Sequence, residues 1–75
     1  MAKIYPVRSL IYAKYDSEAE LCRELGWPRQ RLNRITNGTK EPDIREVKIL
    51  AEKLECPFEK LADMFLRHFE EKEGA

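Results

Sequence analysis

The segment between Trp27 and Lys40 combines basic and amide side chains and contains no acidic residue. Arginine can donate two hydrogen bonds to guanine, and glutamine or asparagine can pair bidentately with adenine. The local positive charge also attracts phosphate, although the formal net charge of the chain is zero. These groups suit the base edges and backbone of a nucleic acid. The alternative is a solvated polar helix face, which is the usual origin of a charged run.

The spacing of the aliphatic residues predicts a helix over residues 28–37. At roughly 100° per residue, Leu32 and Ile35 fall on one side of this helix. The opposite side and its edges carry Arg29, Gln30, Arg31, Asn33 and Arg34. A helix of two or three turns that buries only two aliphatic side chains is poorly stable alone, so it requires a neighbour.

The preceding residues predict that neighbour, a first helix over residues 17–25. Ser17 caps this helix, and Glu20, three residues later, completes a capping box. Gly26 and Gly38 end the two helices, because glycine adopts the left-handed conformation without a steric penalty. The inward side chains of the first helix are Leu21, Cys22 and Leu25. Two short helices joined by a glycine turn form a helix-turn-helix layout.

Residues 17–65 resemble the phage repressor and Cro-type family, the XRE-like family of helix-turn-helix domains. The matching residues are Ser17, Glu20, Leu21, Leu25, Gly26, Leu32, Ile35, Asn37, Gly38, Pro42, Leu50, Ala51, Leu54, Phe58 and Leu61. The resemblance implies an all-α, five-helix, lambda-repressor-like DNA-binding domain. Its helix-turn-helix motif covers residues 17–38 at the second and third helices, and the second motif helix enters the major groove.

The resemblance also implies roles for individual residues toward double-stranded DNA. The family reads bases from the start and outer face of the second motif helix, at positions occupied here by Arg29, Gln30, Asn33 and Arg34. Phosphate contacts come from the flanks of the motif, which here are Ser17, Arg31, Asn37, Thr39 and Lys40.

Three positions depart from the family pattern. Glu18 stands where the family often has a glutamine near a phosphate, so a phosphate contact there is disfavoured. Cys22 replaces a frequent alanine, and a thiol is small enough to fit. Thr36 occupies the position of an acid that pairs with an arginine of the first helix, and the facing position is Ile11. Both charges are absent together, so neither is left buried without a partner.

The remaining residues predict three more helices within a single domain of residues 1–75. A helix over residues 6–15 begins at a proline, which suits a first turn. A helix over residues 43–55 begins with a capping box of Asp43 and Glu46. Its inner side is predicted to carry Ile44, Val47, Leu50, Ala51 and Leu54.

The last helix, over residues 58–71, is longer than the family resemblance requires. The inner side predicted for it comprises Phe58, Leu61, Ala62, Phe65 and Phe69. Phe65, Leu66 and Phe69 lie beyond the common core. These extra turns either cover the first helix and the N-terminal arm or form a homodimer surface, as a symmetric operator requires. In the arm, Lys3 is a further candidate phosphate contact.

Composition argues against several other classes of protein. One histidine and two cysteines, Cys22 and Cys56, cannot build a four-ligand zinc site, and both thiols are expected to be free in a reducing cytosol. No catalytic constellation or phosphate-binding glycine loop is found, so we expect neither an enzyme nor a cofactor. No apolar run is long enough to span a membrane and no signal peptide is found, so a cytoplasmic location is expected.

Two functions are consistent with these features. The first is sequence-specific binding to double-stranded DNA by a transcriptional regulator of the repressor/Cro or antitoxin kind. The second is a protein-interaction module that keeps this fold but binds another protein, such as a toxin or a phage protein. The polar face over residues 29–34 favours the first, because an interaction module would more often expose apolar side chains there.

Overall fold

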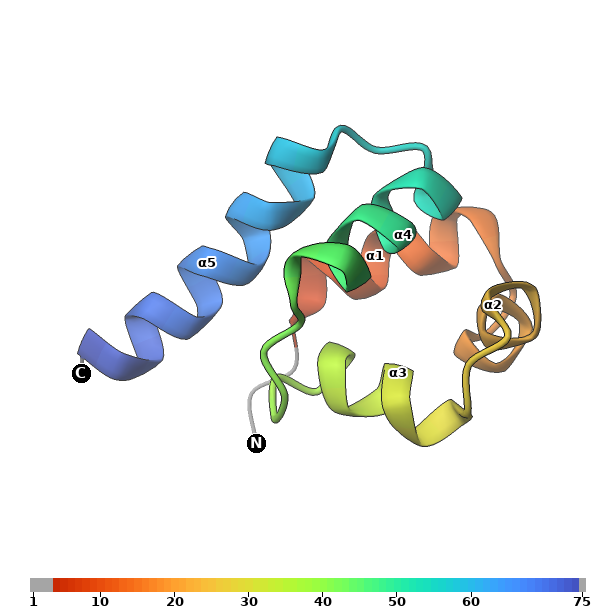
Figure 1. Cartoon of the computed structure of the whole chain (residues 1–75), viewed down its shortest axis with the longest axis horizontal. Coiled ribbons are helices and arrows are strands. Elements are labelled where there is room, and N and C mark those ends of the chain that lie inside the picture. Colours follow the sequence, from red (N-terminus) through yellow and green to blue (C-terminus); the bar gives the residue numbers. More distant parts are fainter. Residues whose placement is uncertain (1–3, 75) are drawn as a thin grey trace.

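The computed structural model describes residues 4–74, with side chains described up to residue 70. Its helices are α1 (Tyr5–Lys14), α2 (Glu18–Leu25), α3 (Arg29–Thr36), α4 (Ile44–Leu54) and α5 (Phe58–Gly74). No strand occurs in this part of the chain, so the all-α, five-helix prediction is confirmed (Figure 1). Lys3, the candidate phosphate contact in the arm, lies outside the described residues.

The helix ends follow from local side-chain and backbone signals. At α2 the Ser17 hydroxyl oxygen accepts a hydrogen bond from the Glu20 N–H at 3.2 Å. Gly26 then ends α2 with a φ of 73°, in the left-handed region. A complete capping box forms at α4, where the Asp43 side chain and the Glu46 side chain each accept from the other residue's N–H. At α2 only the first half of the predicted box is found among the described residues.

Boundaries differ from the predicted ones by more than one residue only at the end of α5. α1 begins at Tyr5 with Pro6 in its first turn. α5 continues to Gly74, beyond the predicted end at residue 71. The other helices begin and end within one residue of the predicted limits, because caps and glycines mark those ends locally.

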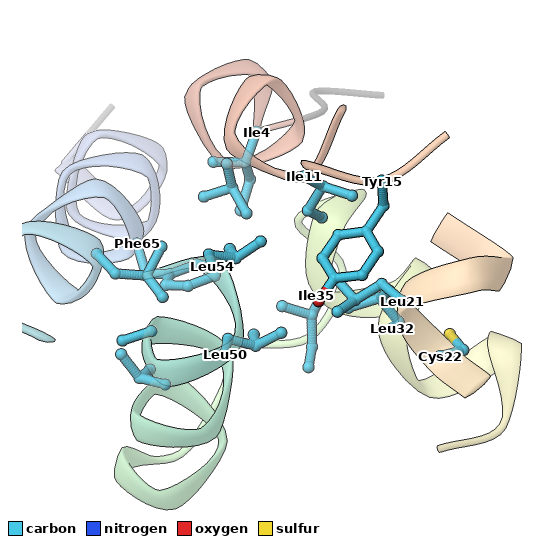
Figure 2. Packing of buried hydrophobic residues seen from close by; sticks show 14 residues of the cluster. Ile4, Ile11, Tyr15, Leu21, Cys22, Leu32, Ile35, Leu50, Leu54 and Phe65 are labelled. Atoms are coloured by element: carbon cyan, nitrogen blue, oxygen red, sulfur yellow. The ribbon is translucent and has the colours of Figure 1, made fainter. Parts of the chain in front are cut away.

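The helices pack around α1, which contacts each of the other four. Val7 and Ile11 are its fully buried side chains. The core around them contains Ile4, Tyr15, Leu21, Cys22, Leu32, Ile35, Val47, Leu50, Ala51, Leu54, Leu61 and Phe65 (Figure 2). Side chains of α2 and α3 therefore share one core with α4 and α5, and this packing supplies the stability that a short α3 lacks by itself.

Two residues predicted to face inward are exposed, so those predictions were wrong. Ile44 is 76% exposed and Phe58 is 36% exposed. Both line an open groove between the beginning of α4 and α5, together with Pro42, Ala62 and Leu66. Helical periodicity specifies the side that a residue faces, but it does not specify whether a neighbouring helix reaches far enough to cover that residue. Here α5 leaves Ile44 uncovered, whereas Glu46 and Val47 in the same turn are buried.

The two cysteines are both free thiols, as predicted. Cys22 is buried on α2, where it fills the position that small residues often occupy. Cys56 is half-buried in the turn between α4 and α5. Burial raises the pKa of the Cys22 thiol, with a smaller contribution from the nearby Glu18 carboxylate. Cys22 therefore behaves as a small apolar core residue.

Candidate nucleic-acid interface

The third helix separates its apolar and polar side chains onto two sides. Leu32 and Ile35 are fully buried against the core. Arg29, Gln30 and Arg34 are exposed, and Asn33 is half-exposed at the edge. In Figure 1, α3 lies along the lower margin of the molecule, on the opposite side from α5. The face proposed from the sequence is thus presented to solvent, with the rest of the fold behind it.

A shallow hollow collects several predicted residues beside α3. Ser17, Arg29, Asn33 and Asn37 all line it. The Ser17 hydroxyl accepts from Glu20, so its own hydrogen remains available for a phosphate oxygen. Sequence reasoning did not assign the two α1 residues that also line the hollow, Arg8 and Tyr12. The only signal for them was the basic character of the first fifteen residues.

Glu18 and Arg8 form a charged pair at the junction of α1, α2 and α3. A Glu18 carboxylate oxygen lies 3.9 Å from the Arg8 Nε, and the other accepts a hydrogen bond from the Thr36 hydroxyl at 3.2 Å. Thr36 and Ile11 are both buried and uncharged, as expected. The sequence did not predict the charged pair of Arg8 and Glu18 that lies at this junction. The pair uses an acid from α2 and an arginine one turn away from Ile11.

Arg31 and Lys40 converge on a single buried carboxylate, that of Glu46. The Arg31 Nε and the Lys40 Nζ each lie 2.9 Å from the same oxygen, Oε2. The other oxygen, Oε1, accepts from the Asp43 N–H at 3.0 Å. The Arg31 guanidinium also stacks over the Trp27 ring, 4.1 Å from its centroid. Sequence reasoning identified Glu46 only as a capping residue.

The charge state of Glu46 follows from these contacts. Burial favours the neutral acid and by itself raises the pKa of the Glu46 carboxyl. Hydrogen bonds from Lys40, from the Asp43 N–H and from Arg31 outweigh that effect and leave the pKa below its ordinary value. Glu46 is therefore an anion at neutral pH, and the two half-exposed cations around it leave a local net positive charge.

Thr39 and Lys40 also close the end of α3. The Thr39 hydroxyl donates to the Arg34 carbonyl at 3.1 Å. The N–H groups of Thr39 and Lys40 donate to the same carbonyl oxygen, at 3.0 and 3.1 Å. These hydrogen bonds attach the following loop to α3. The Thr39 hydroxyl hydrogen is already used within the protein, which weakens the case for a phosphate contact by this side chain.

Neither a cluster of possible metal ligands nor a membrane-spanning helix is found among the described residues. No group of three histidine, cysteine or acidic side chains within the described part of the chain is arranged to hold a metal ion. No helix in the same part is long and apolar enough to cross a membrane.

The short helices α2 and α3, joined by a turn at Gly26 and with the polar face of α3 exposed, have the layout of a helix-turn-helix protein. The helix-turn-helix family model matches residues 13–61, which is more than half of the chain. The chain therefore belongs to this family, the XRE-like, Cro/C1-type group of helix-turn-helix proteins. Membership supports a DNA-binding function of the transcription-regulator type, in a family that is not typically enzymatic. Searches of curated proteins and of solved structures returned no match.

Proposed function

We propose that this chain binds specific sequences in double-stranded DNA as a transcriptional regulator, with α3 in the major groove. One observation carries the proposal. Arg29, Gln30 and Arg34 are exposed on α3, and none of them has a side-chain hydrogen bond or ion pair with another described residue. Gln30 and Arg34 lie one turn apart, so both can reach base edges together. Asn33 contributes from the edge of this face.

Backbone phosphates would be held on both sides of α3. On one side, Ser17 and Asn37 line the hollow together with Arg8. On the other side, Arg31 and Lys40 are about two-fifths exposed. The Glu18 carboxylate reduces the positive charge of the hollow, although Arg8 and the Thr36 hydroxyl partly offset it. This arrangement fits the general division in which phosphate contacts position a protein and base contacts specify its site.

The proposal includes a homodimer on a symmetric site, with Leu66 at the interface. Of the three residues considered from the sequence, Phe65 is 3% exposed and Phe69 is partly buried against the core. Leu66 is 54% exposed and lies beside the exposed Ile44 and Phe58. Phe65 thus packs the extra turns of α5 against the core of its own chain. Leu66 is the residue through which a second copy would pack.

Binding measurements on a selected site test the reading face. Selection from random DNA supplies a cognate duplex, and Gln30→Ala and Arg34→Ala are then compared with Lys60→Ala, which removes a charge from α5. We expect each α3 variant to lose about 1–3 kcal/mol on the cognate duplex and to relax preference at one base pair. Lys60→Ala should behave as the parent protein. Unchanged affinity and preference in both α3 variants would refute base reading by this face.

A protein-interaction role is the second candidate, and the apolar groove is the observation that favours it. Pro42, Ile44, Phe58 and Leu66 line this groove on a side of the molecule that α3 does not form. A toxin or phage protein could bind there without involving the reading face. Failure to bind any duplex at low salt, while the protein is folded, would put this candidate first. The cytoplasmic location stays a prediction.

A further inference from the structure

The Glu46 carboxylate is an unusual feature, because it is buried while the cations that it holds are not. The residue is 1% exposed, whereas the side chains of Arg31 and Lys40 are 41% and 43% exposed. Both cations bind the same oxygen atom at 2.9 Å, so their nitrogen atoms cannot be more than twice that distance apart. Without the anion, two cations so close together would repel each other.

Helix capping does not explain this arrangement. The cap requires only Oε1, which accepts the Asp43 N–H, and a glutamine side chain can do the same. Burial of a carboxylate is costly unless good partners compensate it, and replacement by an apolar residue is often tolerated better. The second oxygen, Oε2, is committed entirely to Arg31 and Lys40. Its role is therefore to hold these two cations together.

The outer parts of the two cations remain available. Only the Nε of Arg31 is hydrogen-bonded among the described residues, so its two terminal nitrogens can still donate. The Trp27 ring fixes the plane of the guanidinium. The Lys40 ammonium has one hydrogen bond to the protein and keeps two further hydrogens. Two adjacent cations with free donors match the two unesterified oxygens of one phosphodiester group.

From this geometry we infer that Glu46 is a positioning residue for DNA binding: it holds Arg31 and Lys40 as a clamp for a single backbone phosphate. The inference rests on the proposed function and assigns part of its phosphate contacts. Arg31 lies on α3, Lys40 lies in the loop that follows, and Glu46 lies on α4. The clamp therefore fixes both the reading helix and its flanking loop to the body of the domain while the phosphate is bound.

The first experiment counts phosphates by salt dependence. The logarithm of the binding constant decreases linearly with the logarithm of salt concentration. The magnitude of this slope decreases by about 0.9 for each phosphate that the protein no longer neutralises. We compare the parent protein with Arg31→Gln, Lys40→Gln and the double variant on one duplex. A shared phosphate predicts that the slope of the double variant is smaller by about one unit. A reduction of about two units would show two independent phosphates and overturn the clamp, and so would an unchanged slope.

The second experiment removes the anchor. Glu46→Gln adds a unit of positive net charge, so electrostatic attraction alone predicts tighter, more salt-dependent binding. The clamp predicts the opposite: weaker binding to all duplexes, a slope reduced by up to one unit, and unchanged base preference. Asp43→Asn is the matched control, because it removes a nearby negative charge but keeps a good N-cap residue. Tighter binding by Glu46→Gln would overturn the inference. If that variant does not fold, the slopes of the Arg31 and Lys40 variants still decide.

One further measurement tests the phosphate site without DNA, and the binding data then separate the clamp from the proposed function. Melting temperatures are recorded in inorganic phosphate and in chloride at equal ionic strength. A phosphate-dependent rise in the parent that is absent from the double variant would show that these two cations bind a phosphate group and would support the clamp. A rise of equal size in both proteins would show that phosphate binds elsewhere and would overturn it. If the parent protein binds no duplex, both the proposed function and the clamp fail. If Gln30→Ala and Arg34→Ala alter binding but Glu46→Gln does not weaken it, only the clamp fails.

Discussion

Replacement of Leu32 by alanine tests whether α3 depends on the shared core. Leu32 is fully buried, so truncation removes its apolar packing and leaves a cavity between α3 and the core. Buried leucine-to-alanine changes cost about 2–5 kcal/mol, and we expect about 2–4 kcal/mol here. A 75-residue domain has a total stability of about 4–11 kcal/mol, so this cost is a large share of the whole.

The assay is urea unfolding followed by far-UV circular dichroism and Trp27 fluorescence. Leu66→Ala is the matched control, measured without DNA at a concentration at which the protein is monomeric, because it makes the same chemical change at a residue that is 54% exposed. Its cost should stay below about 1 kcal/mol, since the leucine side chain buries little apolar surface there. At about 4–8 °C per kcal/mol, Leu32→Ala should also lower the melting temperature by about 10–30 °C. Equal costs at the two positions, or a cost below about 0.5 kcal/mol at Leu32, would refute this account of the core.

Three further predictions follow from burial and charge. Because the pKa of Glu46 is lowered, its stabilising effect is fully present above the ordinary value of 4.5 and is lost as pH falls through the lower folded-state pKa. The difference in unfolding free energy between the parent and Glu46→Gln should therefore stay constant from pH 6 to 8 and shrink in acid; a change within pH 6–8 would contradict it. Cys56 should react with iodoacetamide much faster than buried Cys22 in the native protein, and equal rates would show that α2 opens readily. Leu66→Glu should convert a dimer to a monomer in sedimentation at tens of micromolar with operator DNA, and a parent that stays monomeric with DNA would rule out the dimer.

Most of the secondary structure could be predicted from the sequence because its signals are local. Ser17 caps α2 and Gly26 ends it through groups within a few residues, and the same is true of Asp43 at α4. The spacing of Leu32 and Ile35 likewise specified which side of α3 faces the core. The family resemblance added the arrangement of the helices and the candidate roles on α3. None of these inferences needed a contact between distant parts of the chain.

Only the tertiary structure decided how charged and apolar groups far apart in sequence are used. Glu46 belongs to a predictable cap, but its second oxygen accepts a hydrogen bond from Arg31, fifteen residues away, because the fold brings the first turn of α4 within reach of an α3 side chain. Glu18 acquires Arg8 as a partner across α1 and α2 for a similar reason. Ile44 continues an apolar pattern and is still exposed, because α5 does not extend far enough to cover its side chain. Sequence periodicity reports the direction of a side chain along its own helix, whereas pairing and burial depend on where the neighbouring helices lie.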